Sequence, residues 1–337
     1  MRVYGYKHGR RLDMVTIAAE KESKEIEDSL ENNQTKKMGK KKKIVIVGAR
    51  IHPGETPSSY VCQGMIQFLV SDHPVAKMLR DHVIFKFIPM LNPDGSYVGN
   101  YRTCILGQDL NRCWTETSAH AYPTLAAVKA VIESLSSDKD VDLDMYLDLH
   151  AHTGLLGAFV YGNSYTDVYR FQRHTLFPKH LSYCAQDFSL ENTAYNKDRS
   201  KSGTSRRFLS SFLNDKVNCY TLEVSFHGYE VLKGNSSTVT VYNEEEYIRL
   251  GESICHSLLD YYVTIKYIPA EDIPACLHDT FSSKGAKSRL QHLITKSPKK
   301  TTKQTTGKGK EQPSKNVKPK VPSKNVMYQG KTEEVKA

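Results

Sequence analysis

The chain has 337 residues, of which 39% are hydrophobic and 25% are charged, which suits one large α/β domain or two small ones. Its net charge of +10 lies at one end, because residues 284–337 contain 15 Lys and Arg against 3 Asp and Glu, so the remainder carries about −2. A nucleic-acid-binding domain carries its positive charge on the folded surface, and no apolar run approaches the roughly 20 residues of a membrane helix. The composition therefore argues against nucleic-acid binding and against membrane insertion.

The N-terminus and the cysteines indicate a reducing compartment. Residues 1–13 are polar and basic and lack the apolar core of a signal peptide. The seven cysteines are scattered and do not form CxxC pairs, which is typical of free thiols and not of a disulfide framework. We therefore expect a cytosolic protein.

Composition divides the chain into three regions. Residues 1–43 hold one strand-like run, at 14–19, followed by a charged connection with few apolar residues. Residues 44–270 alternate strand and helix signals and form the expected folded domain. Residues 282–337 are rich in Lys, Thr, Ser, Pro and Gly and almost free of large apolar residues, so they predict a disordered basic tail.

The middle region predicts a three-layer α/β fold. Thr56 and Pro57 suit the start of one helix, and Asn243 with Glu246 three residues later suits the start of the last one. Continuous β-branched and apolar runs between the helices are typical of strands buried on both faces. These runs are 43–51, 83–91, 145–151, 157–163 and 219–225. We expect a mostly parallel mixed sheet between two layers of helices.

Histidine and acidic residues lie at the ends of three of these runs. His52 and Glu55 follow the first run, His150 ends the third, and Glu223 lies in the last. Ligands bind such sheets at the carboxyl ends of the strands, and catalytic zinc takes three His or carboxylate ligands. The pattern predicts a zinc ion on His52, Glu55 and His150. Glu223 is then the separate catalytic carboxylate that takes a proton from the attacking water.

Six short motifs occur in the order found in zinc metallocarboxypeptidases. They are HPGE (52–55), NPDG (92–95), GNYR (99–102), DLNR (109–112), LDLHAH (147–152) and YTLE (220–223). Over about residues 40–265 the chain resembles the cytosolic carboxypeptidase branch of that family. Members of this branch remove glutamates from protein C-termini and from side-chain polyglutamate branches, above all on tubulin. The resemblance implies the α/β metallocarboxypeptidase fold and one zinc ion per chain.

The resemblance also implies which residues bind the substrate. Arg102 would polarise the scissile carbonyl and stabilise the oxyanion that develops on it. Asn111 and Arg112 would bind the terminal carboxylate of the substrate, because a planar guanidinium can donate two parallel hydrogen bonds to it. Such a clamp makes an exopeptidase, since only a chain end offers a carboxylate at this position.

Specificity for glutamate requires a cation near the last side chain of the substrate. Arg206 resembles the arginine of a GT-small-Arg motif and is the expected contact, with Lys201 and Arg207 as alternatives. Two other positions stay open. His152 is an alternative metal ligand on the same side of its strand as His150. Tyr195 is the nearest match for a tyrosine that the family places near the substrate.

The chain departs from the cytosolic carboxypeptidase pattern at its N-terminus. Only 51 residues precede His52, too few for the β-rich domain that this branch carries before the catalytic one, so the chain resembles a short form. We expect a glutamate-specific zinc exopeptidase that deglutamylates proteins. Its expected partners are polyglutamylated or glutamate-terminated proteins such as tubulin, and its expected location is the cytosol, including microtubules, centrioles or cilia.

Two alternative functions remain open. In the first, the chain would be a catalytically impaired module that binds acidic tails, the N-terminal domain being absent; in the second, it would be a zinc deacylase of the aspartoacylase type. The deacylases share an HxxE…H site, but the NPDG and DLNR motifs favour a carboxypeptidase.

Overall fold

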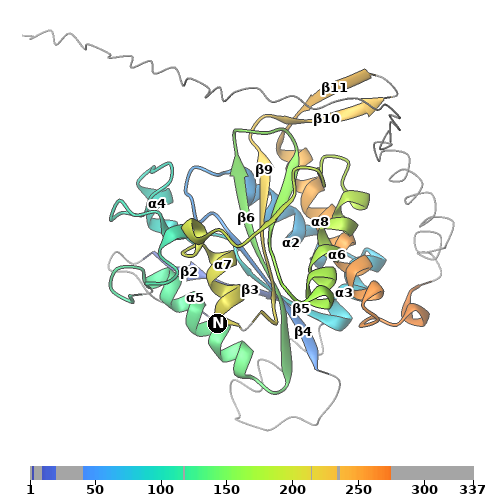
Figure 1. Ribbon diagram of the computed structural model, residues 1–337, viewed down its shortest axis with the longest axis horizontal. Coiled ribbons are helices and arrows are strands. Elements are labelled where there is room, and N and C mark those ends of the chain that lie inside the picture. Colours follow the sequence, from blue (N-terminus) through green and yellow to red (C-terminus); the bar gives the residue numbers. More distant parts are fainter. Residues whose placement is uncertain are drawn as a thin grey trace, which may run out of the picture. The chain divides into compact units, whose positions relative to one another are not determined.

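The computed structural model describes residues 2–3, 10–19, 41–116, 118–213, 215–233 and 236–274, all within one unit, Met1–Leu290. Most of the charged connection expected before residue 44 lies outside the described residues, and so does the expected tail at 282–337. Figure 1 shows a central sheet with helices on both of its sides.

All five predicted strand runs correspond to strands of the structure. The strands are β1 (Arg2–Val3), β2 (Leu12–Asp13), β3 (Val15–Ile17), β4 (Lys42–Ala49), β5 (Val83–Ile88), β6 (Val141–His152), β7 (Ala158–Asn163), β8 (Ala194–Asn196), β9 (Asn218–Ser225), β10 (Gly228–Lys233) and β11 (Ser236–Val241). The α-helices are α2 (Pro57–Val70), α3 (Pro74–His82), α4 (Pro93–Tyr97), α5 (Pro123–Ser137), α6 (Val168–Cys184), α7 (Ser205–Phe212) and α8 (Glu244–Thr264). The 3₁₀ helices are η1 (Leu110–Arg112), η2 (Arg199–Lys201) and η3 (Ala270–Asp272).

The central sheet has the strand order β3-β5-β4-β6-β9-β7-β8. Strands β5, β4, β6 and β9 run parallel to one another, whereas β3 is antiparallel to β5 and β7 is antiparallel to β9. The expectation of a mostly parallel mixed sheet is therefore confirmed. The carboxyl ends of β4, β6 and β9 meet at one edge of the sheet, which places the chemistry there.

The two faces of the sheet bury two separate apolar cores. Side chains alternate along a strand, so Val45 and Val47 of β4 point to one core while Ile44 and Ile46 point to the other. Helices α2, α3, α6 and α8 cover the first face, and α5 and α7 cover the second (Figure 1). The three-layer architecture follows from this alternation.

The predicted helix starts are present. Asn243 caps α8, since its side-chain oxygen accepts a hydrogen bond from the backbone N–H of Glu246 at 2.9 Å. Pro57 occupies the first turn of α2, but the expected Thr56 cap is wrong, because the Thr56 backbone is helical and its side chain makes no capping hydrogen bond to α2. The two helices pack closely at glycines: a Cβ on Gly64 would lie 2.2 Å from the carbonyl oxygen of Ile248 on α8. A larger residue at Gly64 would force these helices apart.

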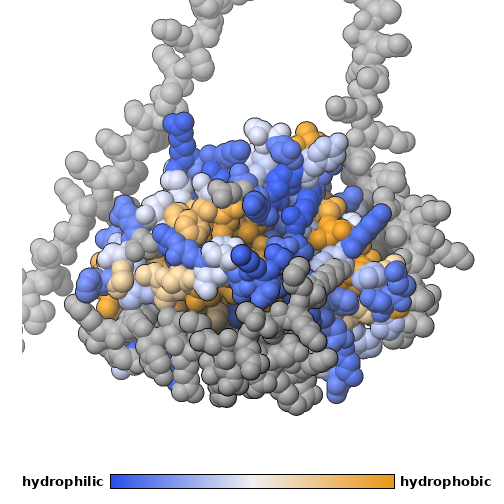
Figure 2. Space-filling model, turned by 90° about the horizontal axis from the view of Figure 1, so that it is seen from below, coloured by the Kyte–Doolittle hydropathy of each residue, from blue (hydrophilic) through white to orange (hydrophobic). Residues whose placement is uncertain are grey.

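Apolar side chains reach the surface in separate places. On the face shown in Figure 2, hydrophobic areas are divided by hydrophilic side chains. A shallow apolar pocket between the β2–β3 segment, β5 and α5 is lined by Leu12, Met14, Ile88, Ala127, Val128 and Val131. Among the described helices, none combines the length and the apolar character that crossing a bilayer requires.

His174 on α6 is fully buried and held as a neutral imidazole. Its Nε2 accepts a hydrogen bond from the backbone N–H of Asn163 at 2.9 Å, and its Nδ1 donates to Asn218 Oδ1 at 3.1 Å. Burial lowers the pKa of His174 to about 3, because the hydrogen bond to Asn218 only partly offsets the loss of water. Other titratable groups around the ring are Tyr165, Tyr195, Tyr220, Arg170, Arg173 and Arg206.

We expect His174 to make folding stability decrease in acid. An unfolded histidine has a pKa of about 6.5, so between that pH and about 3 the unfolded chain binds a proton that the folded chain does not. Between pH 7 and pH 5 this one group should cost about 2 kcal/mol of unfolding free energy. In the His174→Gln variant that part of the pH dependence should disappear, as measured by urea unfolding at several pH values. Parallel pH profiles of the two proteins would contradict the assignment.

Candidate metal centre and its surroundings

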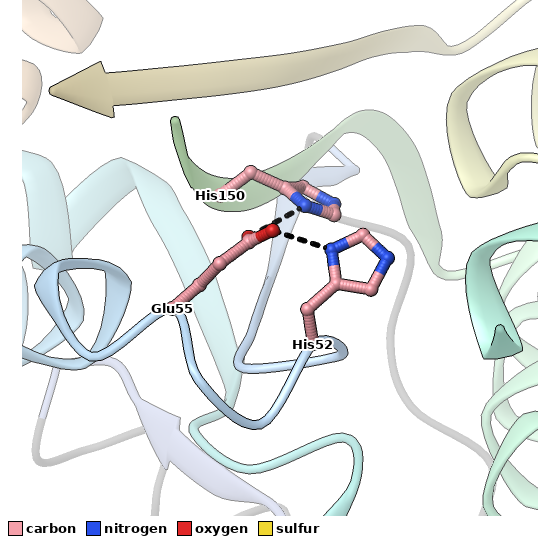
Figure 3. Close-up of side chains that lie close together, drawn as sticks. All are labelled: His52, Glu55 and His150. Carbon is pink, nitrogen blue, oxygen red and sulfur yellow. Dashed lines mark hydrogen bonds and ion pairs between the residues drawn. The ribbon is translucent and has the colours of Figure 1, made fainter. Parts of the chain in front are cut away.

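Three predicted ligands come together at the carboxyl ends of two neighbouring strands. His52 and Glu55 lie in the loop after β4, and His150 lies near the end of β6. All three are buried, and their ligand atoms lie within 4.8 Å of one another. Figure 3 shows both imidazole rings turned toward the Glu55 carboxylate. Within the described part of the chain, this is the group of His, Cys, Asp and Glu side chains that could hold a metal ion.

Each imidazole faces two carboxylates through its two nitrogens. The Nδ1 atoms of His52 and His150 lie 2.6 Å and 3.0 Å from the two oxygens of Glu55. The Nε2 atom of His52 lies 3.0 Å from Asp109, and that of His150 lies 2.9 Å from Asp148. A carboxylate behind a ligating histidine fixes the tautomer and orients the ring. The arrangement therefore leaves both Nδ1 atoms for a metal ion shared with Glu55.

The Glu55 carboxylate stays ionised in this environment. Burial alone would raise its pKa, but attraction and hydrogen bonds to His150 and His52 outweigh burial and hold the pKa well below its usual range. The backbone N–H of Ala151 also donates to Glu55 Oε2 at 3.0 Å. Two imidazoles and one ionised carboxylate form the donor set that catalytic zinc prefers.

Glu223 on β9 is fixed beside His150 by the register of the sheet. The two residues are direct partners across the parallel β6–β9 ladder, so their side chains project from the same face. Burial raises the pKa of Glu223 to about 7, and the negative charge of Glu55 adds to this, while His150 acts in the opposite direction. A carboxyl with a pKa near neutral is suited to take up and release a proton.

Asp109 connects the metal site to Arg102. While one oxygen of Asp109 faces His52, the other accepts hydrogen bonds from Arg102 at 3.0 Å and 2.7 Å. The Arg102 side chain is still 43% exposed, and that of Arg112, on η1, is 38% exposed. Both guanidiniums therefore keep donors that a substrate can reach.

Asn111 is held in one orientation by a hydrogen bond from Ser205. Its Oδ1 accepts from the backbone N–H of Ser205 at 2.9 Å, and its Nδ2 lies 3.3 Å from His150 Nε2. Ser205 also hydrogen-bonds to Asp148 through its hydroxyl group. The start of α7 thus supports both the predicted clamp and the histidine partner, a role that the sequence did not indicate.

Arg206 lies directly after Ser205 and is 4% exposed. It donates to the carbonyl oxygen of Gly162 at 2.6 Å, to Asn163 Oδ1 at 2.9 Å and to Asn196 Oδ1 at 3.1 Å. Burial lowers its pKa to about 10. Its next neighbour, Arg207, is half-buried, whereas Lys201 is exposed on η2.

Two positions left open by the sequence are not part of the metal-ligand group. His152 is outside the metal-ligand group; its Nδ1 accepts from the backbone N–H of Leu155, and its ring packs against Phe159. Tyr195 packs against His174 and Phe171 on the α6 face of the sheet, opposite to the face that carries Glu223. Tyr195 therefore lies on the other side of the sheet from Glu223, whereas His152 lies on the same face of β6 as His150.

Known proteins similar to this chain include carboxypeptidases. The zinc carboxypeptidase family matches residues 7–247. Cytosolic carboxypeptidase 6 of Mus musculus is 46% identical over 253 residues, which are 75% of this chain and 44% of that protein. Cytosolic carboxypeptidase 6 of Caenorhabditis elegans is 39% identical over 259 residues, which are 75% of this chain and 53% of that protein. The chain thus spans about half the length of the curated relatives it matches.

A solved structure shows the same fold. The metallo-carboxypeptidase from Burkholderia cenocepacia is 24% identical and superposes with a TM-score of 0.64, covering 79% of this chain and 64% of that chain. The resemblance drawn from the six sequence motifs is therefore confirmed. With the family match extending from residue 7 to residue 247 and including all of these candidate residues, the chain belongs to the zinc carboxypeptidase family.

Proposed function

We propose that the chain is a zinc metallocarboxypeptidase that removes glutamates from protein C-termini or from side-chain polyglutamate branches. The observation that carries this proposal is the convergence of two features at one sheet edge. A buried His–Glu–His group lies beside Asn111, whose Nδ2 atom is 3.3 Å from His150 Nε2, and Arg112 is the next residue in η1. The first feature suits hydrolysis, and the second suits recognition of a chain end.

His52, Glu55 and His150 would hold the zinc ion. Their donor atoms are close enough to share one ion, and the carboxylates behind the two histidines suit the metal. When bound, zinc acts as a Lewis acid and lowers the pKa of the attacking water.

Other residues have separate roles in cleaving the last peptide bond of the substrate. Arg112 and Asn111 bind the terminal carboxylate and so place the bond beside the metal site. Arg102 donates to the carbonyl oxygen as negative charge develops on it. Glu223 accepts the proton of the attacking water and passes it to the amine nitrogen as the C–N bond breaks. The products are a free amino acid and a chain shortened by one residue.

A basic residue that contacts the side chain of the substrate's last residue would favour glutamate at that position. Arg206 is a buried cation next in sequence to Ser205, which hydrogen-bonds to Asn111. Relatives of this chain are named cytosolic carboxypeptidases, which supports a cytosolic location. We therefore place glutamate-rich protein ends, including those of tubulin, among its substrates, and microtubules, centrioles or cilia among its sites of action.

The alternatives are less well supported. A module that only binds acidic tails would have no need of a paired carboxylate behind each histidine. A small-molecule deacylase is disfavoured by the family match. The deciding test is mass spectrometry of a peptide that ends in several glutamates, incubated with the purified chain. Successive losses of one glutamate support the proposal; cleavage of N-acyl amino acids alone would replace it with the deacylase.

Metal removal should affect both activity and stability. We expect a chelator to abolish the glutamate losses and added zinc to restore them. An ion present at 100 times its Kd stabilises the fold by about 2.7 kcal/mol, which raises the unfolding midpoint of a domain of this size by about 5–10 °C. A thermal melt with and without chelator measures the shift. The His150→Ala variant, which lacks one ligand, is the control and should show little zinc-dependent shift.

A further inference from the structure

The Arg206 guanidinium is a buried cation with no carboxylate partner among the residues that the structure describes. Its acceptors are neutral oxygens, those of Gly162, Asn163 and Asn196. Across the residues that the structure describes, no acidic side chain forms an ion pair with Arg206. Buried arginines are normally paired, because an isolated charge loses its hydration without compensation. The site therefore favours an anion that comes from outside the chain.

Asn163 is held so that its oxygen, not its nitrogen, faces the cations. Its Nδ2 donates to the carbonyl oxygens of Arg206 (3.4 Å) and Cys219 (3.2 Å). Its Oδ1 can then accept from two guanidiniums at once, Arg206 at 2.9 Å and Arg207 at 3.1 Å. Asn163 is fully buried, so this one neutral oxygen holds two positive charges in place with little water to screen them.

The two asparagines lie on the face of the sheet that carries the catalytic carboxylate. Asn163 and Asn196 are register partners on β7 and β8. Tyr161, two residues before Asn163, pairs with Thr221, which is two residues before Glu223 on β9. Strand residues two apart share a face. The Asn pair and Glu223 thus face the same layer, where α7 brings Arg206.

The clamp for the terminal carboxylate lies beside the cation. Ser205, adjacent to Arg206, donates its backbone N–H to Asn111, and a Cβ on Gly203 would lie 2.2 Å from the carbonyl oxygen of Arg112. The segment before Arg206 is therefore packed directly on the proposed clamp. An acidic group on the residue that Asn111 and Arg112 hold would lie in the same layer as this cation.

We propose that Asn163 and Asn196 are specificity-determining positioning residues: their neutral oxygens hold Arg206 in place and leave its charge for the acidic side chain of the substrate's last residue. This inference rests on the proposed function, because it takes the bound chain end as given. A carboxylate at either position would hold the guanidinium equally well and neutralise it in advance. Neutrality at positions 163 and 196 is therefore what would separate glutamate from glutamine at the chain end.

The test measures binding, so that it does not depend on turnover. In the zinc-loaded Glu223→Gln chain, the Kd of a glutamate-terminated peptide is compared with that of the same peptide ending in glutamine. Adding Asn196→Asp should raise the Kd of the glutamate peptide about 10- to 100-fold and leave the Kd of the glutamine peptide nearly unchanged. Asn163→Asp, at the more buried position, should act in the same direction.

The Asn196→Ala variant distinguishes the effect of an added negative charge from the effect of losing the oxygen that holds Arg206. It removes the oxygen without adding a negative charge, so the preference for glutamate should fall less than in Asn196→Asp. A purely structural role would make the alanine variant the worse of the two, or would weaken both peptides equally, and either result would overturn the proposal. Equal binding of both peptides by the parent chain would also overturn it. If the unmodified chain binds the glutamate peptide more tightly than the glutamine peptide and yet cleaves neither, that result contradicts the proposed hydrolysis but leaves this inference intact.

Discussion

Replacing Glu223 by Gln is expected to lower kcat for glutamate-terminated peptides by about 10²- to 10⁴-fold, the range typical of a lost general base. The amide has nearly the shape of the carboxyl group but cannot accept the proton of the attacking water. Because Glu223 lies outside the group of metal-binding side chains, zinc should remain bound at one ion per chain. Mass spectrometry of the peptide products and metal analysis of the purified variant measure the two quantities.

The matched control is Glu245→Gln, the same change at an exposed position in the first turn of α8. It should leave the rate within about twofold, because surface changes away from a site have small effects. Loss of zinc in Glu223→Gln would mean that Glu223 helps to hold the metal. An unchanged rate with zinc bound would show that another group accepts the proton.

Replacing Arg112 by Met should have the second large effect, on recognition of the chain end. Removing one partner of a hydrogen-bonded charge pair costs about 2–5 kcal/mol, which corresponds to at least about 30-fold in kcat/KM. We expect the loss mainly in KM, and we expect Arg112→Lys to be intermediate, since lysine keeps the charge but not the two parallel hydrogen bonds. Steady-state kinetics on the glutamate-terminated peptide measure both values.

A C-terminally amidated peptide shows whether Arg112 acts through the terminal carboxylate. The unmodified chain should strongly prefer the free acid, and Arg112→Met should lose most of this preference. Arg11→Met is the control, because the ion pair of Arg11 among the described residues is a long, exposed one with Asp13. If Arg112→Met weakens cleavage but keeps the full preference for the free acid, another residue binds the carboxylate.

The metal ligands could be predicted from the sequence because they follow from general rules of parallel sheets. Continuous apolar runs identified the central strands, and the carboxyl ends of such strands meet at one edge. These rules, together with the resemblance of the six motifs, predicted that His52, Glu55 and His150 lie together, as they do in the structure. The start of α8 was likewise predictable, because Asn243 and Glu246 form a local capping pattern.

The supporting residues could not be predicted, because their partners depend on how distant elements pack. Asp148 sits inside an apolar run, and nothing in that run indicates that it lies behind His150. Asn163 and Asn196 meet only because β7 turns antiparallel to β9 and β8 pairs with it. Strand β8 has three residues, too few to give a periodic signal.

The pairing of His150 with Glu223 divides the site into a fixed part and an adjustable part. Their separation is set by the spacing of neighbouring strands, about 4.8 Å, and by backbone hydrogen bonds that substitutions in loops leave intact. The groups that would recognise the substrate come instead from η1 and from the first turn of α7, beside connecting segments. Evolution can therefore change which chain ends are accepted by altering these segments, without disturbing the distance between His150 and Glu223.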